Sequence, residues 1–324
     1  MTIDLPLCTE EVSCTLEKIF DIEKLKNPKV TFDVGSKLGE GFLAINAAVD
    51  VTGDNRNLHL FVKAAPKHLK LREVSETEVA YTNELRFYQQ IYPKVEEFYH
   101  EKTKKSLQFA PKFYAGSTEH MKEILVLENL KRTDFELNGI RNTFDEEQIL
   151  TIMEKYGKFH GIGFALKDQK KDIFDNITCN IKDFLYLLFQ SMGLSYIVKY
   201  RSKFMEKYLQ APEDVEILEK IRFLGENLDN ILEKLRDFKG DFRTILHGDC
   251  WSNNIMFRKN EENQWDIRLI DFQAVKLNSP VLDLCYVFYA AASSEESLAK
   301  LDWYLDVYHQ SLSNTIKELG SDPE

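Results

Sequence analysis

The alternation of apolar and polar positions predicts β strands in the first part of the chain. Residues 30–64 alternate as paired strands do, with a turn signal at 53–55. Two further short apolar runs, at 113–116 and 123–127, are also typical of strands. Residues 75–92 instead place apolar side chains at helical spacing, with acidic residues in the first turn. The first part is therefore predicted to be an antiparallel sheet with one helix.

The second part of the chain carries long patterns with the period of amphipathic helices. A capping-box pattern at 143–146 opens the first of them. His160 lies within this helix and is interpreted as a packed side chain rather than a catalytic one. Residues 180–210 and 212–238 form two more helical patterns, the second with Pro212 in its first turn.

Length and composition fit two packed lobes. The chain has 324 residues, of which 44% are hydrophobic and 29% charged, so it can bury a sizeable core. The order of the elements predicts an α+β protein. We expect a small antiparallel-sheet N-terminal lobe at residues 1–130 and a larger, mainly helical C-terminal lobe at 131–324.

The net charge indicates which partner to expect, and the cysteine content and the apolar runs indicate which cellular compartment. A net charge of −11 disfavours nucleic acid and anionic membranes, and a small molecule is the expected partner. The five cysteines are odd in number and form no CxxC pair, so neither a zinc site nor a disulfide framework is indicated. The N-terminus lacks the features of a signal peptide, and the longest apolar run, 281–292, is shorter than the ~20 residues of a membrane helix. We expect a cytoplasmic, monomeric protein.

Two short segments in the last third of the chain carry the candidate chemistry. His247-Gly248-Asp249 follows an apolar run, and Asn254 stands at the spacing of the kinase catalytic loop H-R-D-x-x-x-x-N. Asp271 follows a second apolar run, where a kinase carries D-F-G. Either string alone occurs by chance in loops, but the two in this order predict strands that deliver Asp249, Asn254 and Asp271 to one kinase-type site.

Phosphoryl transfer from ATP explains why these residue types are needed. The reaction requires a carboxylate that orients the attacking hydroxyl and accepts its proton, and Asp249 fits this role. It also requires oxygen ligands that hold Mg²⁺ against the phosphates. Asn254 and Asp271 are predicted to be these ligands.

Two candidate nucleotide contacts lie in the predicted sheet. Gly39 and Gly41 form a Gly-x-Gly bend that lets the backbone approach phosphates, but Ala44 replaces the third glycine of the full motif, and a simple hairpin turn is the commoner meaning. Lys63 lies in the following strand, like the lysine of the kinase sequence V-A-I-K that pairs with ATP phosphates. The alternative for Lys63 is a solvated strand lysine.

A lysine in this role needs a carboxylate that positions it. Glu84 lies in the predicted helix at 75–92 and could form that ion pair with Lys63. Glu76 and Glu78 in the same helix are alternatives, and an exposed helical carboxylate is the ordinary interpretation of all three.

A hinge for adenine is predicted after the strand at 123–127. This strand is followed by Glu128 and, two residues on, by Leu130, where a two-lobed kinase reads the base through main-chain N–H and C=O groups. Glu128 and Leu130 are therefore candidate nucleotide contacts.

Several features argue against a peptide substrate. The interval between Asp271 and Asp283 is too short for the activation segment and A-P-E motif of a protein kinase. Gln273 replaces the glycine of D-F-G, and Trp251 stands where protein kinases that act on serine or threonine usually carry lysine. The long, mostly helical stretch at 131–246 is suited to a substrate-binding insertion.

The sequences HGDCWSNNIMF (247–257), LIDFQ (269–273) and SPVLDLCYVF (279–288) resemble the ecdysteroid kinase-like family of small-molecule kinases. This family belongs to the wider group of aminoglycoside phosphotransferases and choline kinases. The resemblance covers residues 63–292. It implies a two-lobed, protein-kinase-like fold with ATP and Mg²⁺ as cofactors.

The resemblance also implies roles for individual residues. It makes Asp249 the base, Asn254 and Asp271 the metal ligands, Lys63 the phosphate contact and Glu84 its support. Asp283 would brace the catalytic loop from the following helix, and His247 would be structural. The chain ends 41 residues after Asp283 (324 minus 283), whereas relatives continue through further helices, so we expect a short C-terminal lobe and question whether the acceptor pocket is complete.

The expected function is transfer of the γ-phosphate of ATP to a hydroxyl of a steroid-like (ecdysteroid) or xenobiotic acceptor, in hormone inactivation or detoxification. Aromatic and aliphatic residues at 184–196 favour an apolar, uncharged acceptor. One alternative is a choline or ethanolamine kinase, which needs an aromatic and acidic pocket. Another is a catalytically weak binding protein, against which the retained Asp249, Asn254 and Asp271 argue.

Overall fold

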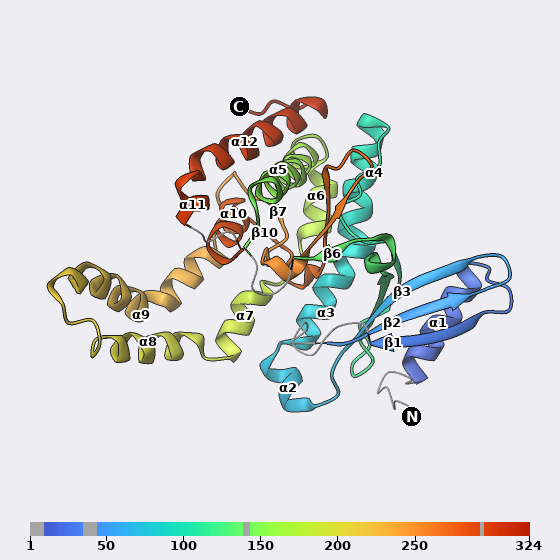
Figure 1. Ribbon diagram of the computed structural model, residues 1–324, viewed down its shortest axis with the longest axis horizontal. Helices are drawn as coiled ribbons and strands as arrows, with labels where there is room; N and C mark the ends of the chain where they lie inside the picture. Colours follow the sequence, from blue (N-terminus) through green and yellow to red (C-terminus); the bar gives the residue numbers. More distant parts are fainter. Residues whose placement is uncertain (1–9, 35–43, 139–142, 292–294) are drawn as a thin grey trace.

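A computed structural model of the chain describes residues 10–34, 44–138, 143–291 and 295–324. Gly39 and Gly41, the predicted glycine bend, lie outside the described residues. The described chain forms one lobe around an antiparallel sheet and a larger, mostly helical lobe (Figure 1). The predicted fold class is confirmed.

The first lobe is built on a five-stranded antiparallel sheet with the order β1-β2-β3-β5-β4. Its strands are β1 (Lys29–Val34), β2 (Ile45–Thr52), β3 (Asn57–Ala64), β4 (Phe113–Ser117) and β5 (Ile124–Glu128). Alternate residues of β2 and β3 are buried, because one face of these strands packs against α1 (Glu10–Ile22). α1 was not predicted from the sequence, although Val12, Leu16 and Ile19 are spaced as on one helical face.

A long helical segment covers the opposite face of the sheet. The short helix α2 (Leu69–Val74) leads into α3 (Thr77–Arg86), which continues through the π-helical turn η1 (Phe87–Ile91) into α4 (Tyr92–Thr103). Leu125 and Leu127 of β5 pack in the same core as Tyr81 and Leu85 of α3. The helix predicted at 75–92 is therefore present, but it is longer than expected and contains a π turn.

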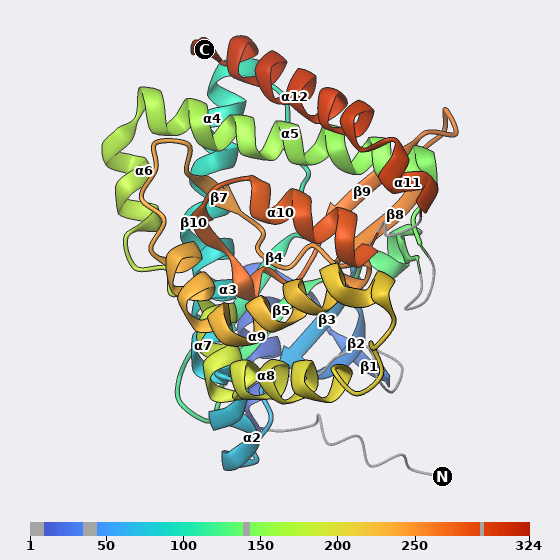
Figure 2. The same ribbon diagram turned by 90° about the vertical axis from the view of Figure 1, so that its left-hand side faces the viewer.

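Two helices that run side by side in the same direction, α5 (Glu146–Gln169) and α12 (Leu301–Glu318), form the frame of the second lobe (Figures 1 and 2). They approach closely at Gly157, where an added Cβ would lie 2.5 Å from the carbonyl oxygen of Tyr308. The predicted capping box at 143–146 was misplaced. The N-cap is Asp145, which accepts from the Gln148 N–H at 2.8 Å, while the Gln148 Oε1 accepts from the Asp145 N–H at 3.1 Å.

A helical insertion follows α5. It contains α6 (Lys171–Thr178), α7 (Phe184–Ser191), α8 (Leu194–Met205), the 3-10 turn η3 (Pro212–Asp214) and α9 (Val215–Arg236). The single helix expected at 180–210 is wrong, because the chain turns at Gly193, which has a φ of +63°. The helices α8 and α9 pack on each other as a hairpin that projects from the body (Figures 1 and 2).

Two small sheets support the segments that carry the candidate chemistry. One pairs β7 (Thr244–Leu246) with β10 (Lys276–Asn278), and the other has the order β6-β8-β9. The strands of the second sheet are β6 (Glu136–Leu137), β8 (Ile255–Lys259) and β9 (Trp265–Leu269). The remaining elements are η2 (Leu130–Thr133), η4 (Ser252–Asn254), η5 (Phe272–Ala274), α10 (Val281–Tyr286), η6 (Val287–Ala291) and α11 (Glu295–Ala299).

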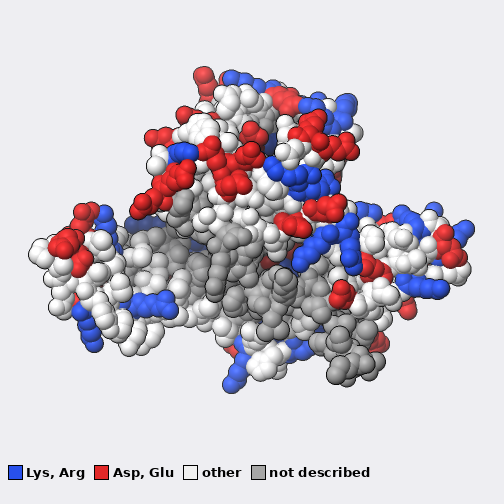
Figure 3. Space-filling model, in the orientation of Figure 1, with Lys and Arg blue, Asp and Glu red and all other residues white. Residues whose placement is uncertain are grey.

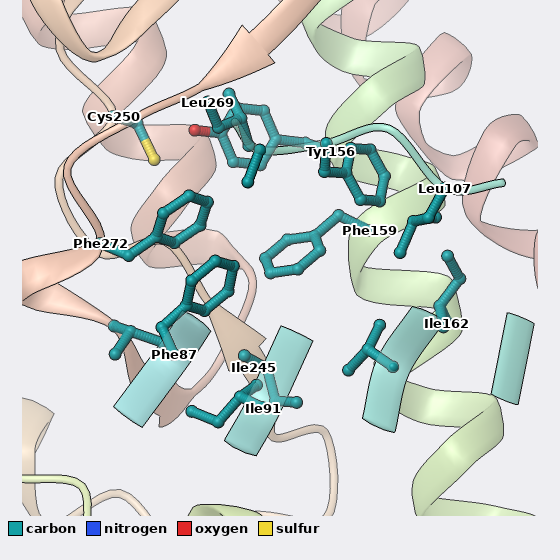
Figure 4. Packing of buried hydrophobic residues seen from close by; sticks show 14 of the residues in the cluster. Phe87, Ile91, Leu107, Tyr156, Phe159, Ile162, Ile245, Cys250, Leu269 and Phe272 are labelled. Carbon is teal, nitrogen blue, oxygen red and sulfur yellow. The ribbon is translucent and has the colours of Figure 1, made fainter. Parts of the chain in front are cut away.

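A continuous apolar core connects the two lobes (Figure 4). Phe87 of η1 stacks on Phe272, with ring centroids 3.5 Å apart and an interplanar angle of 6°. Ile91 and Ile245 lie beneath these rings, and Phe159 of α5 lies beside them. The helix of the first lobe is thus packed directly against the segment that holds Asp271.

Within the described ranges, no helix combines the length and the apolar character needed to cross a membrane.

Candidate active site

Asp249 and Asp271 lie on two adjacent turns, each placed just after a short strand. β7 leads to Asp249, and β9 leads to Asp271. The turns are joined by hydrogen bonds, because the Ile270 N–H donates to the Asn254 carbonyl at 3.0 Å and His247 Nε2 lies 2.9 Å from the Ile270 carbonyl. The predicted convergence of the two segments is therefore present.

Both the backbone conformation and the packing at position 248 require a glycine. Its φ is +85°, and an added Cβ would lie 2.1 Å from the carbonyl oxygen of Ala274. A side chain at this position would be strained and would also collide with the backbone of the Asp271 turn. The glycine therefore allows the two turns to pack in contact.

Asp283 of α10 braces the turn at residues 247–249, which we call the catalytic turn because it carries the candidate base Asp249. Its two carboxylate oxygens accept the backbone N–H groups of His247 at 2.8 Å and Gly248 at 2.9 Å, and one of them lies 3.2 Å from His160 Nε2. Burial opposes the charge, but the hydrogen bond and charge of His160 outweigh it, and the pKa of Asp283 is lowered. His160 itself is fully buried and also contacts the Tyr308 hydroxyl at 3.0 Å, so it is the packed histidine that we expected.

Asp249 is partly buried beside polar partners. The Asn254 Nδ2 donates to its Oδ2 at 2.9 Å and to its carbonyl oxygen at 2.9 Å. The Tyr286 hydroxyl also hydrogen-bonds this carboxylate. Burial and the nearby charge of Asp271 raise the pKa of Asp249, while the hydrogen bonds act in the opposite direction. A carboxylate with a raised pKa is a better proton acceptor.

Lys63 connects the first lobe to the Asp271 turn. Its Nζ lies 2.6 Å from Glu84 Oε2 and 2.6 Å from Asp271 Oδ1. Burial opposes the charge of the lysine, but the two carboxylates outweigh it, and the pKa of Lys63 is raised. Burial also raises the pKa of Glu84, against the attraction of Lys63. The ion pair predicted from sequence is present.

The two alternative acidic partners face elsewhere. Glu76 accepts a hydrogen bond from Ser191, and Glu78 lies beside His120 and Arg72. Glu84 is therefore the member of this helix that meets Lys63.

The backbone at Asp271 has a conformation that few residues adopt. Its φ of +65° lies in the left-handed region, which is uncommon for a residue other than glycine and is concentrated at functional sites. This conformation turns the chain sharply after β9, so that the carboxylate meets Lys63 while Phe272 packs on Phe87.

The predicted hinge lies at the end of β5 in the five-stranded sheet, to which neither Asp249 nor Asp271 belongs. The Glu128 N–H donates to the Lys112 carbonyl at 2.8 Å, and the Leu130 carbonyl accepts the Phe135 N–H at 3.1 Å. These two main-chain groups are engaged within the protein. The adenine-binding role of Glu128 and Leu130 stays a prediction.

Three residues near the site were missed by the sequence analysis. Asn83 donates to the carbonyls of Lys182 at 2.8 Å and Gln273 at 3.1 Å, Phe87 stacks on Phe272, and Tyr286 bonds Asp249. Asn83 and Phe87 flank Glu84 within the helix predicted at 75–92, and this proximity was the available signal.

The oxygen donors of the site fit a magnesium ion. The Asn254 Nδ2 points at Asp249, which leaves its Oδ1 as a donor for a metal, and Lys63 occupies only Oδ1 of Asp271. Carboxylate and amide oxygens are the ligands that Mg²⁺ prefers. Asn254 and Asp271 could hold the ion from the protein side.

The two-lobed fold and this arrangement of lysine and carboxylates define a protein of the kinase-like class. The sequence profile of the Ecdysteroid kinase-like family matches residues 39–321. The chain belongs to this family, as its motifs indicated.

Comparison with solved structures finds distant similarities. The GDP and kanamycin complex of APH(2")-IIia is 13% identical, with a TM-score of 0.45 over 96% of this chain and 89% of that one. Choline kinase LicA from Streptococcus pneumoniae is 15% identical, with a TM-score of 0.38 and coverages of 96% and 89%. A Plasmodium vivax ethanolamine kinase is 10% identical, with a TM-score of 0.43 and coverages of 96% and 80%. A search of curated proteins finds no significantly similar sequence.

Proposed function

We propose that this protein is an ATP-dependent small-molecule kinase that transfers the γ-phosphate of ATP to a hydroxyl group. The observation that supports it most directly is the chain of contacts Glu84–Lys63–Asp271, next to an Asp249 carboxylate held by Asn254. This arrangement brings a cation, two carboxylates and an amide to one place, as phosphoryl transfer requires.

Asp249 would act as the base. Its raised pKa and its position beside Tyr286 and Asn254 suit a carboxylate that orients a hydroxyl and accepts its proton as the new O–P bond forms. Because Asp283 fixes the backbone on the N-terminal side of Asp249, the carboxylate is held in place before the acceptor binds.

Lys63, Asn254 and Asp271 would serve the nucleotide. Lys63 would contact its phosphates while Glu84 keeps the lysine charged and oriented. Asn254 and Asp271 would hold Mg²⁺, which neutralises phosphate charge when bound. Gly39, Gly41, Glu128 and Leu130 complete the proposed nucleotide contacts.

The acceptor that we propose is an apolar, uncharged hydroxyl compound, steroid-like (ecdysteroid) or xenobiotic. The insertion supports this choice, because α8 and α9 expose several large apolar side chains, including Tyr196, Tyr200 and Phe223. The four cysteines in the described part of the chain are free thiols, which supports a cytoplasmic location. A monomer and a role in hormone inactivation or detoxification belong to the same proposal.

Measurement of ADP release against a panel of steroid, phenolic and amino alcohols tests the function. We expect release with steroid or phenolic alcohols that depends on Mg²⁺ and is lost in Asp249→Asn. Robust turnover of choline with none of the steroid or phenolic alcohols would contradict the proposed acceptor. A chain that binds Mg-ATP but phosphorylates nothing in the panel would favour a binding protein.

A further inference from the structure

A cavity of about 590 Å³ lies between α7, the end of α9 and the β7–β10 pair. None of Asp249, Asn254 and Asp271 lines it, so it is separate from the candidate catalytic carboxylates. The cavity nevertheless lies near the candidate active site. Asn83 links the two, because it donates both to the carbonyl of Lys182, which lines the cavity, and to the Gln273 carbonyl of the Asp271 turn.

The lining of the cavity is strongly basic. Lys182, Arg236, Arg243 and Lys276 contribute four positive charges, and Asp183 contributes one negative charge. This excess of three positive charges (four minus one) contrasts with the net charge of −11 of the whole chain. A cavity lined by one sign of charge concentrates ions of the opposite sign.

Carboxylates neutralise only part of this charge. Asp183 lies 3.2 Å from the Lys276 Nζ and also caps α7 by accepting from the Tyr186 N–H. Arg236 pairs with Asp237 and stacks on the Tyr186 ring. For Lys182 and Arg243, by contrast, no carboxylate partner occurs in the described ranges.

Arg243 carries the clearest sign of a missing partner. Its Nε is buried and meets no hydrogen-bond acceptor among the described residues. Burial of a cationic donor without an acceptor costs more free energy of folding than a typical hydrogen bond contributes. Nearby, Lys167 donates to the Asp241 and Arg243 carbonyls, and burial together with the charge of Arg243 lowers the pKa of Lys167. The surroundings of Arg243 are therefore positive and short of acceptors.

The rest of the wall is apolar. Ile181, Leu187 and Leu277 line the cavity, and the ring of Tyr186 adds an aromatic surface. The volume lies in the range of about 300 to 1,000 Å³ that small-molecule sites occupy. There is room for an anionic group and for an apolar body attached to it.

We propose that this cavity binds a small molecule that carries a phosphate, sulfate or carboxylate group on an apolar or aromatic body. Arg243 and Lys182 supply the donors for the oxyanion, since a guanidinium and an ammonium form strong charge-assisted hydrogen bonds with such oxygens. Tyr186, Ile181 and Leu277 pack on the body of the ligand. This inference does not rest on the proposed function.

Calorimetric titration of the full chain with inorganic phosphate and with phenyl phosphate tests the site. We expect both probes to bind, and phenyl phosphate to bind more tightly because its ring meets the apolar wall. The double variant Lys182→Gln/Arg243→Gln should weaken both affinities by about tenfold for each charged hydrogen bond lost. The matched control Lys94→Gln/Lys220→Gln removes two positive charges from exposed helical positions elsewhere and should bind as the parent does.

A further variant separates the cavity from the nucleotide site. Lys63→Met should leave binding of phenyl phosphate unchanged, and a loss in this variant with none in the cavity variant would overturn the proposal. An absence of binding to the parent chain would also overturn it. The unfolding temperature of each variant shows whether it is folded, and the exposed Lys182→Gln alone replaces the double variant if Arg243→Gln fails to fold.

Discussion

The catalytic turn and the α8–α9 hairpin differ in how each is held. The backbone N–H groups of His247 and Gly248 are fixed by Asp283, which is itself buried against His160. On the hairpin, Tyr196 and Tyr200 are 75% and 65% exposed. Uncharged side chains cover much of the hairpin surface in Figure 3.

This contrast separates two requirements of a small-molecule kinase. Phosphoryl transfer needs groups that are fixed before the reaction, whereas recognition of varied acceptors tolerates an exposed and adaptable surface. The comparison predicts that substitutions in the catalytic turn act on the rate or on stability, and that substitutions on the hairpin act on acceptor affinity.

The largest effect is expected for Asp249→Asn. Loss of the proton acceptor should lower the rate of phosphoryl transfer by ~10² to 10⁴, while calorimetric titration should show nearly unchanged Mg-ATP affinity. Near-normal turnover, or a complete loss of nucleotide binding, would mean that Asp249 has a different role.

Asp283→Ala should have the largest effect on stability. It leaves the buried N–H groups of His247 and Gly248 and the ring of His160 without their acceptor. We expect a loss of about 3 to 5 kcal/mol in the free energy of unfolding, measured in urea. Asp302→Ala, at an exposed position of α12, is the matched control and should change little. Equal stability of the two variants would show that the brace contributes nothing.

Asp271→Asn should affect binding as well as turnover. Substitution of a residue that only hydrogen-bonds a metal ligand lowers metal affinity by ~10- to 100-fold. Loss of a metal-binding carboxylate should therefore weaken Mg-ATP affinity by at least ~10-fold. Titrations at low and high Mg²⁺ test this, because added Mg²⁺ should restore part of the affinity. Affinity equal to that of the parent at low Mg²⁺ would remove Asp271 from the metal site.

The pH dependence of the rate reports the surroundings of Asp249. Because burial and Asp271 raise its pKa, the rate should fall with decreasing pH from a value above the ordinary 3.8, as the carboxylate becomes protonated. Tyr286→Phe removes a hydrogen bond that lowers this pKa, so the acid limb should move to higher pH. A rate profile that does not move would show that Tyr286 leaves Asp249 unaffected.

The smallest effect is expected for Tyr196→Ser/Tyr200→Ser on the hairpin. Exposed positions usually change stability by less than ~0.5 kcal/mol, and Mg-ATP affinity should be unchanged. We expect the KM for the hydroxyl acceptor to rise. Strong destabilisation would show that the hairpin is packed as tightly as the catalytic turn.

Local patterns in the sequence were sufficient to predict the sheet and the fold class, because each depends on spacing within single segments. For the partner of Lys63 these patterns left Glu76, Glu78 and Glu84 open, and the family resemblance singled out Glu84, which the structure places beside Lys63. The roles of Asp249, Asn254 and Asp271 in catalysis and metal binding stay predictions, as does the hinge.

The features that were missed depend on contacts between distant segments. Nothing in the local sequence indicates that Asn83 meets the carbonyls of Lys182 and Gln273, or that Phe87 stacks on Phe272. The break at Gly193 was missed because the apolar pattern continues on both sides of it. A glycine within a continuous apolar pattern is also compatible with an unbroken helix. The turn can therefore be recognised only when the packing on each side is known.

The contact between Lys63 and Asp271 spans 208 positions of the sequence, and this separation has a consequence for the growing chain. The ribosome releases Lys63 and Glu84 early, whereas Asp271 follows about 10 to 40 seconds later at typical elongation rates of ~5 to 20 residues per second. Until then the lysine has only one of its two carboxylate partners, and the second half of the catalytic centre does not exist. Under the proposed function, a nascent chain should therefore not consume nucleotide before Asp271 has emerged, and a chain interrupted before Asp271 should be inactive however well its sheet has folded.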